Sequence, residues 1–277
     1  MFKKCMIYTF RPGMLGNQLI IHAHLYAFAK EYNILFFNPS FFYGQYFPNF
    51  KKIKLQKVIF ILFRFFTKLL LKFNLSLPYC KIVFIDWHEK VELNEHFYHQ
   101  YFTNNKFVFL TGWQFRNSSL IMKYKNDIKT IFQPPIDINN NLTNTITQYK
   151  ESFQNIVAVH IRRGDYINFE GGRFFYHLQV YEQLIQHLEK CIFTDKKNLF
   201  LIFSNENLQI TLQNTNYRMV KGTPIEDLYL MSMCDYIIGP PSTFSIWASF
   251  YGNVPLYMVH HPADYPKNLS DFKPAEI

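Results

Sequence analysis

The chain has 277 residues, of which 49% are hydrophobic, so it can bury one large core or two smaller ones and is not a disordered protein. Its 29 basic and 20 acidic residues give a net charge of +9. This excess favours partners with negative charge, such as a nucleotide, a nucleic acid or an anionic lipid.

The four cysteines are far apart and show neither CxxC nor metal-type spacing, which favours a reducing compartment over a disulfide scaffold. The first residues, MFKK, lead directly into a short strand and lack the apolar region of a signal peptide. We therefore expect a cytosolic protein. The cysteines are Cys5, Cys80, Cys191 and Cys234.

Residues 5–10 are expected to form a first strand, followed by a glycine loop at 13–18 and a helix that reaches about Tyr32. Glycines let a backbone approach a ligand, and the free N–H groups at a helix start favour an anion. Gly16 and Asn17 are therefore candidate ligand contacts. The loop lacks both the dinucleotide fingerprint and the Gly-Lys-Ser/Thr of a phosphate-binding Walker A loop.

Residues 51–77 predict a basic amphipathic helix, with cations before an apolar run and then at every fourth residue. Its longest uncharged run is far shorter than the ~20 residues that span a bilayer. Two interpretations stay open: the helix lies on an anionic membrane surface, or it packs on the core with its cations solvated. These cations are Lys51, Lys52, Lys54, Lys57, Arg64, Lys68 and Lys72.

Polar residues and an Asn cluster at 133–155 predict a domain boundary near residue 150, with an N-terminal domain at 1–150 and a C-terminal domain at 151–277. Strands and helices alternate on both sides of it. This pattern predicts an α/β protein of two Rossmann-like domains that face a central cleft. The other expected strands are 82–86, 107–111, 156–160, 199–203, 235–239 and 254–259, and the other expected helices lie near 176–190, near 225–234 and from 246.

The apolar run 156–159 leads into the segment HIRRGDY at 160–166, which indicates a buried strand that ends in a charged turn. Ligands of parallel sheets bind outside the carboxyl ends of the strands, and a guanidinium matches the oxygens of a phosphate. Arg162 is therefore a candidate phosphate ligand. Alternatively, Arg163 and Asp165 form an ion pair that closes the turn.

Other expected strand ends carry polar groups of the same kind, and together with Asn17, Gly16, His160 and Arg162 they suit a nucleotide diphosphate. These groups are Ser204, Ser242 and Thr243. Asp227 begins an apolar helix, where a carboxylate can accept the N–H groups of guanine. Equally, it can be a carboxylate that the helix dipole stabilises.

Five segments, in chain order, resemble the motifs of the α-1,2-fucosyltransferase family and span nearly the whole chain. HIRRGDY and STFSIWA are the most specific of them. The segments are GMLGNQ at 13–18, HLYAFA at 24–29, LTGW at 110–113, HIRRGDY at 160–166 and STFSIWA at 242–248.

The resemblance implies a GT-B fold and inverting transfer of L-fucose from GDP-β-L-fucose to a glycan hydroxyl, such as the 2-OH of a galactose-type residue. The C-terminal domain would hold the donor, and no metal would be needed. The sequence contains no Asp-x-Asp pair. The resemblance also implies residue roles: Arg162 on the β-phosphate, His160 near the guanosine, Asp227 on the guanine, Ser242 or Thr243 on the phosphates, and Asn17 beside the diphosphate or the fucose.

A general base must remove the proton of the acceptor hydroxyl. Glu170 follows His160 by ten residues. The core α-1,6-fucosyltransferases resemble this chain in having a glutamate at the same offset. It is the first candidate, and Asp165 is the alternative, although we expect Asp165 to orient the arginines.

Two other functions are compatible with the sequence. One is a GT-B glycosyltransferase that uses a different GDP-sugar. The other is non-catalytic binding of an anionic membrane or a nucleic acid, for which only residues 51–77 have the required lysines and aromatics. We expect a nucleotide-sugar donor, a glycan acceptor and no nucleic acid. If residues 51–77 lie on a membrane, the acceptor is expected to be a lipid-linked oligosaccharide at its cytosolic face.

Overall fold

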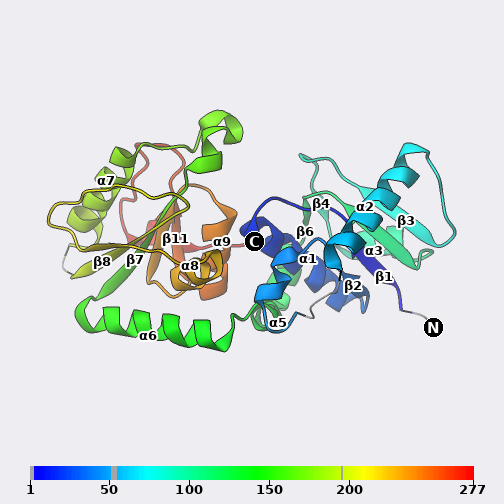
Figure 1. The fold of residues 1–277 in the computed structure, drawn as a ribbon, viewed down its shortest axis with the longest axis horizontal. Helices are drawn as coiled ribbons and strands as arrows, with labels where there is room; N and C mark the ends of the chain where they lie inside the picture. Colours follow the sequence, from blue (N-terminus) through cyan, green and yellow to red (C-terminus); the bar gives the residue numbers. More distant parts are fainter. Residues whose placement is uncertain (1–2, 51–54, 195) are drawn as a thin grey trace. The chain divides into compact units, whose positions relative to one another are not determined.

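The structure is a computed structural model that describes residues 3–50, 55–194 and 196–277. The chain divides into two compact units, one ending at Gln133 and the other beginning at Pro134. Each unit is built on a sheet of mainly parallel strands with helices packed on it (Figure 1). The predicted α/β class is therefore confirmed, with one Rossmann-like sheet in each unit.

The division at Gln133 differs from the predicted boundary at residue 150. The polar stretch that we interpreted as a linker forms a helix, α6 (Ile136–Ser152), which packs on β7 and α8 of the second unit. Leu142 and Ile146 lie four residues apart on one side of this helix and are buried. Two apolar contacts are enough to hold an otherwise polar helix on a core, so composition alone did not reveal it.

The first unit has a four-stranded parallel sheet in the order β2-β1-β5-β3. One face packs against α1 and α3 through residues such as Leu25 and Phe97. On the other face, Phe63 and Phe66 of α2 contact Phe109 of β5. The elements are β1 (Cys5–Tyr8), α1 (Leu15–Glu31), β2 (Leu35–Phe37), α2 (Gln56–Lys72), β3 (Cys80–Phe84), β4 (Val91–Glu92), α3 (Glu95–Phe102), β5 (Phe107–Thr111), β6 (Phe115–Arg116), α4 (Ser118–Lys123) and α5 (Lys125–Ile131).

The second unit has a six-stranded sheet in the order β12-β11-β10-β7-β8-β9, parallel except for β12. Every residue of the central strand β7 is buried, which explains its nearly continuous apolar sequence. The elements after α6 are β7 (Asn155–Ile161), α7 (Leu178–His187), β8 (Asn198–Ser204), β9 (Tyr217–Met219), α8 (Pro224–Met231), β10 (Tyr236–Gly239), α9 (Thr243–Gly252), β11 (Pro255–Met258) and β12 (Lys273–Pro274).

The strand order of this sheet reverses beside β7. From β7 the chain proceeds to β8 and β9 on one side, and then returns to β10 and β11 on the other. The loops after β7 and β10 therefore diverge at the carboxyl ends of these strands, and open α/β sheets bind ligands at such a position, which is called the crevice below. This position is where the predicted site residues of the second unit lie.

The helix predicted within residues 51–77 is confirmed as α2, while Lys51, Lys52 and Lys54 lie outside the described residues. Within the described stretches, no helix is both long enough and apolar enough to cross a membrane.

Candidate functional site

The turn after β7 holds Arg162 in a half-buried position at the crevice. Its Nη2 group contacts both carboxylate oxygens of Asp165, at 2.8 and 2.9 Å, and its guanidinium lies 5.5 Å from the ring centre of Tyr166. Asp165 therefore orients Arg162, as expected. The remaining N–H groups of the guanidinium can donate to an anion.

Arg163 does not pair with Asp165, so that alternative is wrong. Its Nε lies 3.4 Å from Oε2 of Glu206, and its guanidinium lies over Phe175. The second carboxylate oxygen of Glu206 accepts a hydrogen bond of 2.8 Å from the backbone N–H of Gly164. Glu206 thus joins the turn after β7 to the loop after β8 and leaves Arg162 as the arginine that faces the crevice.

Gly164 has a φ of +46°, a conformation that side chains with a Cβ rarely adopt. A Cβ at this position would lie 2.5 Å from Nδ2 of Asn205. The backbone conformation of the turn after β7 therefore favours a glycine, and a Cβ there would displace the side-chain amide of Asn205.

His160 is the sixth residue of β7 and is almost fully buried. Burial and the charge of Arg162 lower the pKa of His160 to about 3, so the imidazole is neutral. Its Nδ1 has no hydrogen-bond partner among the described residues, and its ring lies 5.5 Å from that of Phe244 in α9. An unpaired polar atom in a buried position is costly, and a bound ligand can satisfy it.

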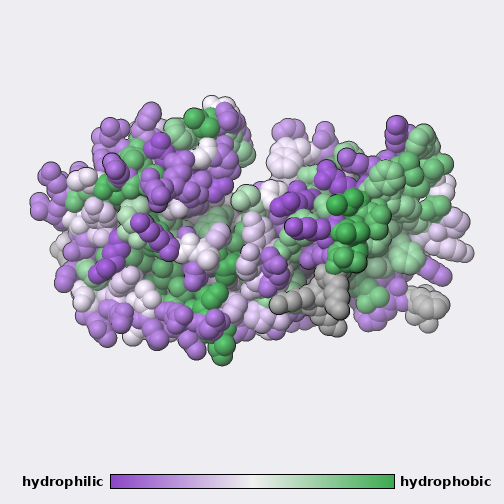
Figure 2. Space-filling view, viewed as in Figure 1, coloured by the Kyte–Doolittle hydropathy of each residue, from purple (hydrophilic) through white to green (hydrophobic). Residues whose placement is uncertain are grey.

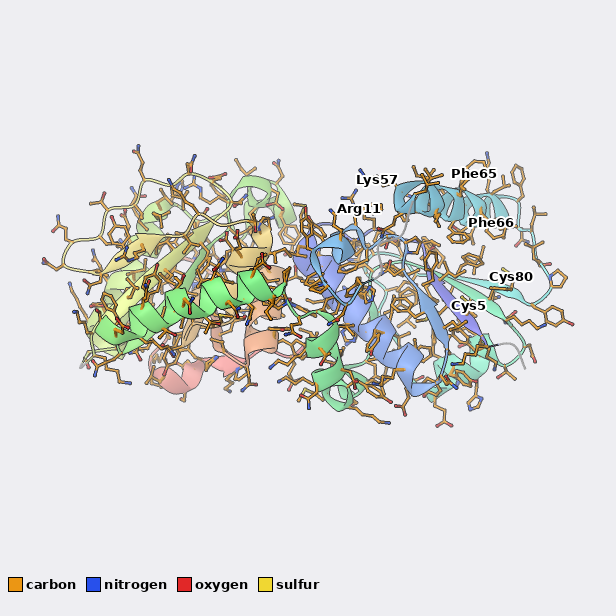
Figure 3. All side chains as sticks on the ribbon, turned by 60° about the horizontal axis from the view of Figure 1, so that its bottom comes forward. Cys5, Arg11, Lys57, Phe65, Phe66 and Cys80 are labelled. Carbon is orange, nitrogen blue, oxygen red and sulfur yellow. The ribbon has the colours of Figure 1, made fainter. Side chains whose placement is uncertain are left out.

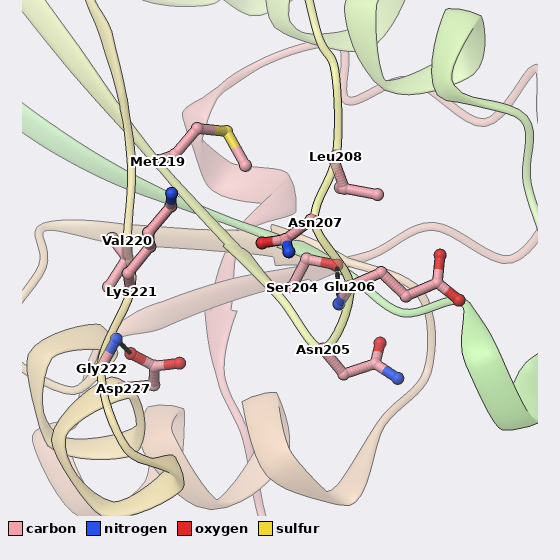
Figure 4. A pocket seen from close by; sticks show the side chains of 10 residues that line it. All are labelled: Ser204, Asn205, Glu206, Asn207, Leu208, Met219, Val220, Lys221, Gly222 and Asp227. Atoms are coloured by element: carbon pink, nitrogen blue, oxygen red, sulfur yellow. Dashed lines mark hydrogen bonds between the residues drawn. The ribbon is translucent and has the colours of Figure 1, made fainter.

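A pocket of about 600 Å³ opens beside the turn after β7. It lies at the carboxyl ends of β8 and β9 and at the start of α8 (Figure 4). Its wall brings together Ser204 and Asp227, two predicted contacts from different parts of the sequence. The other lining residues are Asn205, Glu206, Asn207, Leu208, Met219, Val220, Lys221 and Gly222.

Asp227 accepts a hydrogen bond of 3.1 Å from the backbone N–H of Gly222. Burial raises the pKa of Asp227 to about 6, although this hydrogen bond acts in the opposite direction. The first turn of α8 does not need Asp227 as a cap, because Thr223 and Glu226 form a reciprocal capping box there. A raised pKa in a pocket is typical of a functional carboxylate.

Ser242 and Thr243 begin α9 at the carboxyl end of β10. Ser242 is buried and is the N-cap residue, since its hydroxyl accepts a hydrogen bond of 3.3 Å from the N–H of Phe244. Thr243 is half-buried in the first turn. Tyr166 donates a hydrogen bond of 2.7 Å to the carbonyl of Pro241, which ties the Arg162 turn to this helix start. Ser242 is therefore a structural cap, and Thr243 is the more available hydroxyl.

Glu170 lies in the 3₁₀ segment Phe169–Gly172, which continues from the β7 turn. Its side chain is exposed, and its backbone is left-handed, with φ 47° and ψ 43°. Burial is the main cause that raises the pKa of Tyr166, and the charge of Glu170 also raises it, so Glu170 lies within electrostatic range of the crevice. Backbone strain at a non-glycine residue is often found at functional sites.

Gly16 and Asn17 lie at the start of α1 in the other unit. This helix has no side-chain cap and no acidic residue in its first turn, so its first N–H groups stay available to an anion. The predicted contact of Asn17 with the donor stays a prediction.

Sequence reasoning missed three contributors to this site: Glu206 as an anchor, and Lys221 and Gly222 in the pocket wall. Lys221 and Gly222 follow β9, a three-residue strand that we did not predict. The sequence does indicate this loop, because Lys221-Gly222 stands directly before Thr223-Pro224, a pair typical of the start of a capped helix.

Among the described residues, no group of three or more His, Cys, Asp or Glu side chains has the arrangement of a metal site. The expectation of a metal-independent enzyme stays a prediction.

Two curated relatives each match about three fifths of the chain. An "O-antigen biosynthesis glycosyltransferase WbnK" from Escherichia coli is 28% identical over 179 residues, which cover 58% of each chain. An "Alpha-1,2-colitosyltransferase" from Escherichia coli is 27% identical over 179 residues, which cover 60% of this chain and 59% of the relative. Less than two thirds of each relative is therefore matched.

Similar folds occur in solved fucosyltransferases. A mutant of Arabidopsis thaliana FUT1 in complex with GDP has a TM-score of 0.62 with 11% identity, over 95% of this chain and 71% of that one. NodZ from Bradyrhizobium has a TM-score of 0.55 with 13% identity, over 95% of this chain and 98% of that one. These similarities support the predicted GT-B fold class.

The family described as "Glycosyl transferase family 11" matches residues 3–264, which contain the candidate site and every strand of the two main sheets except β12. The match includes the turn with Arg162, the pocket with Asp227 and the start of α9. The chain belongs to glycosyl transferase family 11.

Proposed function

We propose that this protein transfers L-fucose from GDP-β-L-fucose to a hydroxyl group of a glycan, with inversion at the anomeric carbon. The observation that carries the proposal is the arrangement at one edge of the second sheet. A pocket containing a half-buried carboxylate, Asp227, lies beside an oriented arginine, Arg162, and the start of α9. Such a combination suits a purine base at one end and a diphosphate at the other.

Asp227 is proposed to bind the guanine base. An ionised carboxylate has two acceptor oxygens, which match the adjacent N1–H and N2–H donors of guanine. Uracil lacks such a pair of donors. The pocket of about 600 Å³ has room for a nucleoside.

Arg162 is proposed to bind the β-phosphate and to stabilise the leaving group. When the acceptor oxygen bonds to the anomeric carbon, the bond between that carbon and the phosphate oxygen breaks, and its electron pair leaves with GDP. The guanidinium of Arg162, the hydroxyl of Thr243 and the N–H groups at the start of α9 then meet more negative charge than in the ground state.

Glu170 is proposed to accept the proton of the attacking hydroxyl. Asp165 is engaged by Arg162, whereas Glu170 is exposed beside the crevice. Both carboxylates are exposed, but Asp165 is held by its ion pair, so Glu170, which forms no ion pair with another described residue, suits the role of base better.

The acceptor is proposed to be a surface glycan, with the 2-OH of a galactose-type residue as the site of attack. The names of the relatives support this proposal, since they include an O-antigen glycosyltransferase and a "Galactoside alpha-(1,2)-fucosyltransferase 2" from Mus musculus, 27% identical over 135 residues.

A different GDP-sugar is the second candidate donor. The similarity to an α-1,2-colitosyltransferase favours it, because colitose is fucose without the 3-hydroxyl group. The proposed contacts to the base and the phosphates are the same for both donors. The protein can therefore distinguish the two donors only through its contacts with the sugar.

The test is calorimetric titration with GDP, GDP-fucose, GDP-colitose, GDP-mannose and UDP-galactose, with EDTA present throughout. We expect the guanine nucleotides to bind and UDP-galactose not to bind, with GDP-fucose the tightest sugar nucleotide.

Arg162→Ala should weaken binding and reduce transfer by about 100-fold or more, as is typical when an oriented transition-state donor is lost. The control is Arg173→Ala, which removes an exposed arginine from the neighbouring segment. Equal binding of UDP-galactose, or no effect of Arg162→Ala, would contradict the proposal.

A further inference from the structure

Helix α2 buries one side on the first unit and leaves an apolar strip on the other. Phe60, Thr67 and Leu70 are buried, and Phe66 points toward the sheet in Figure 3, whereas Phe65 lies on the opposite side of the helix. The apolar strip consists of residues spaced four, three and four apart, which places them on one helix face. The strip, with exposed fractions in parentheses, is Val58 (48%), Leu62 (61%), Phe65 (65%) and Leu69 (38%).

A basic strip runs along the same exposed side of α2. Its members are spaced seven, four and four apart, so they form a second row beside the apolar strip. No acidic residue occurs in α2, and no ion pair is formed by this row among the described residues. The basic strip consists of Lys57, Arg64, Lys68 and Lys72.

The hydrophobic surface extends beyond the helix. Figure 2 shows hydrophobic residues gathered over α2 and toward β3. The chain between α2 and β3 and the end of β3 leave five more large apolar or aromatic side chains exposed by 42–62%. Monomeric proteins rarely leave such a surface in water unless it binds something. These side chains are Phe73, Leu75, Leu77, Tyr79 and Phe84.

The charge of the whole chain is concentrated in this region. Residues 32–85 contain eight basic residues and no acidic residue, so they carry +8 of the net +9. The rest of the chain has 29 − 8 = 21 basic and 20 acidic residues and is nearly neutral. The eight are Lys51, Lys52, Lys54, Lys57, Arg64, Lys68, Lys72 and Lys81, of which the first three lie outside the described residues.

We propose that α2 docks this protein on the surface of an anionic lipid bilayer, with the apolar strip among the acyl chains and the basic strip on the lipid phosphates. A helix with cations at every turn cannot lie across the hydrocarbon, but it can lie in the plane of the interface. A second copy of the chain is a poor occupant, because pairing two such faces would bring the two basic strips together. This inference is independent of the donor and the reaction.

The test is sedimentation of the full chain with vesicles of phosphatidylcholine and phosphatidylglycerol, compared with vesicles of phosphatidylcholine alone. We expect binding to the anionic vesicles only, and weaker binding as salt is added, because the phosphate contacts are screened. Two sets of α2 variants separate the two strips. Leu62→Gln with Phe65→Gln and Leu69→Gln removes the apolar strip, and replacing the four cations of the basic strip by Gln removes its charge.

Each set should weaken vesicle binding by about 100-fold or more, given the usual contribution of each cation and each buried apolar side chain. Matched controls change equal numbers of exposed residues elsewhere and should bind like the parent. The charge control replaces Lys190, Lys196, Lys267 and Lys273 by Gln, and the apolar control replaces Met122, Ile136 and Leu269 by Gln.

All variants alter exposed side chains, so their thermal unfolding should match that of the parent. The proposal is overturned if the parent does not bind anionic vesicles, if it binds neutral vesicles equally well, or if the α2 variants bind like their controls. A dimer in solution that the Leu62, Phe65 and Leu69 variant dissociates would also overturn it, since the strip would then be covered by protein.

Discussion

Asp227 is half-buried and is proposed to accept hydrogen bonds from guanine. The affinity for the nucleotide sugar should therefore depend on whether the Asp227 carboxyl is protonated. Burial raises its pKa to about 6, and the protonated form offers one acceptor oxygen fewer to guanine. GDP-fucose affinity should therefore be full above this pKa and fall as the pH drops through about 6. GDP-fucose suits the measurement because its phosphates do not titrate in this range.

Asp227→Asn should bind GDP-fucose about 10- to 100-fold more weakly at neutral pH, the usual loss for a hydrogen bond to a charged group. The variant should also lose the pH dependence near 6, which titration calorimetry at several pH values can measure. A parent affinity that is constant across this range would show that Asp227 does not contact the base.

Glu170 and Asp165 should differ in which kinetic quantity they control. Glu170→Gln should lower kcat by about 10²- to 10⁴-fold, the usual contribution of a general base, and leave donor affinity unchanged. Asp165→Asn should weaken donor binding instead, because Arg162 loses the carboxylate that orients it. Steady-state kinetics combined with titration distinguish the two effects.

The left-handed backbone of Glu170 allows a second test, which separates a catalytic role of its side chain from a structural one. Glycine adopts this conformation without the cost of about 1 kcal/mol that other residues incur. Glu170→Gly should therefore abolish transfer while keeping or raising the thermal unfolding temperature. A variant that is both inactive and unstable would indicate a structural role for Glu170.

At the scale of the elements, the turn between β7 and the 3₁₀ segment Gly164–Ile167 depends on Gly164. Gly164→Ala should lower the free energy of unfolding by about 1–2 kcal/mol through backbone strain. It should also weaken GDP binding, because the new Cβ pushes Asn205 and the turn with Arg162 apart.

Gly171→Ala is the matched control for this prediction. Gly171 also has a positive φ, of +67°, but a Cβ there meets no atom within 4 Å. It should cost similar stability and leave GDP binding intact. If both variants bind GDP equally, the contact between Gly164 and Asn205 does not position the site. Denaturant unfolding and calorimetry measure the two quantities separately.

At the scale of the whole molecule, buried neutral histidines should make the protein sensitive to acid. Burial lowers the pKa of His22, His24 and His160 to about 3. The unfolded chain binds protons at these positions near pH 6.5, while the folded chain does not until about pH 3. The unfolded state thus binds more protons between these values, so stability is lost as the pH falls below about 6.5.

His22→Phe tests this dependence, since His22 already lies among the rings of Phe36, Phe41, Phe50 and Phe132. The variant should reduce the slope of unfolding free energy against pH by about 1.4 kcal/mol per unit between pH of about 6 and about 4. Denaturant unfolding at several pH values provides the slope. An unchanged slope would mean that His22 does not contribute.

Much of the site follows from the sequence because its strands are buried on both faces. β7, β8 and β10 must be apolar, so the polar residues after them stand out, and parallel pairing brings those residues to one edge. This pattern predicts Arg162, Ser204 and Thr243 as candidate site residues. Asp227 is predicted from its place at the start of a helix that lies, in the sequence, between two of these strands.

Other features depended on partners distant in sequence. Glu206 anchors Gly164 across 42 positions, and nothing near either residue indicates the contact. The role of Ser242 as the N-cap of α9 depends on where α9 begins, and its contact with a phosphate stays a prediction. The three-residue strands β2 and β9 form through pairing with neighbours, since so few residues carry little local preference.

The α/β class, the positions of the main strands along the chain and the residue types at their ends can be read from the residues alone, because burial of a parallel sheet imposes those patterns directly. The division at Gln133, the pocket that joins Ser204 to Asp227, and the face of α2 that stays in water follow from the three-dimensional fold. These outcomes depend on which surfaces pack together, and packing is set by contacts between residues that are far apart in the chain.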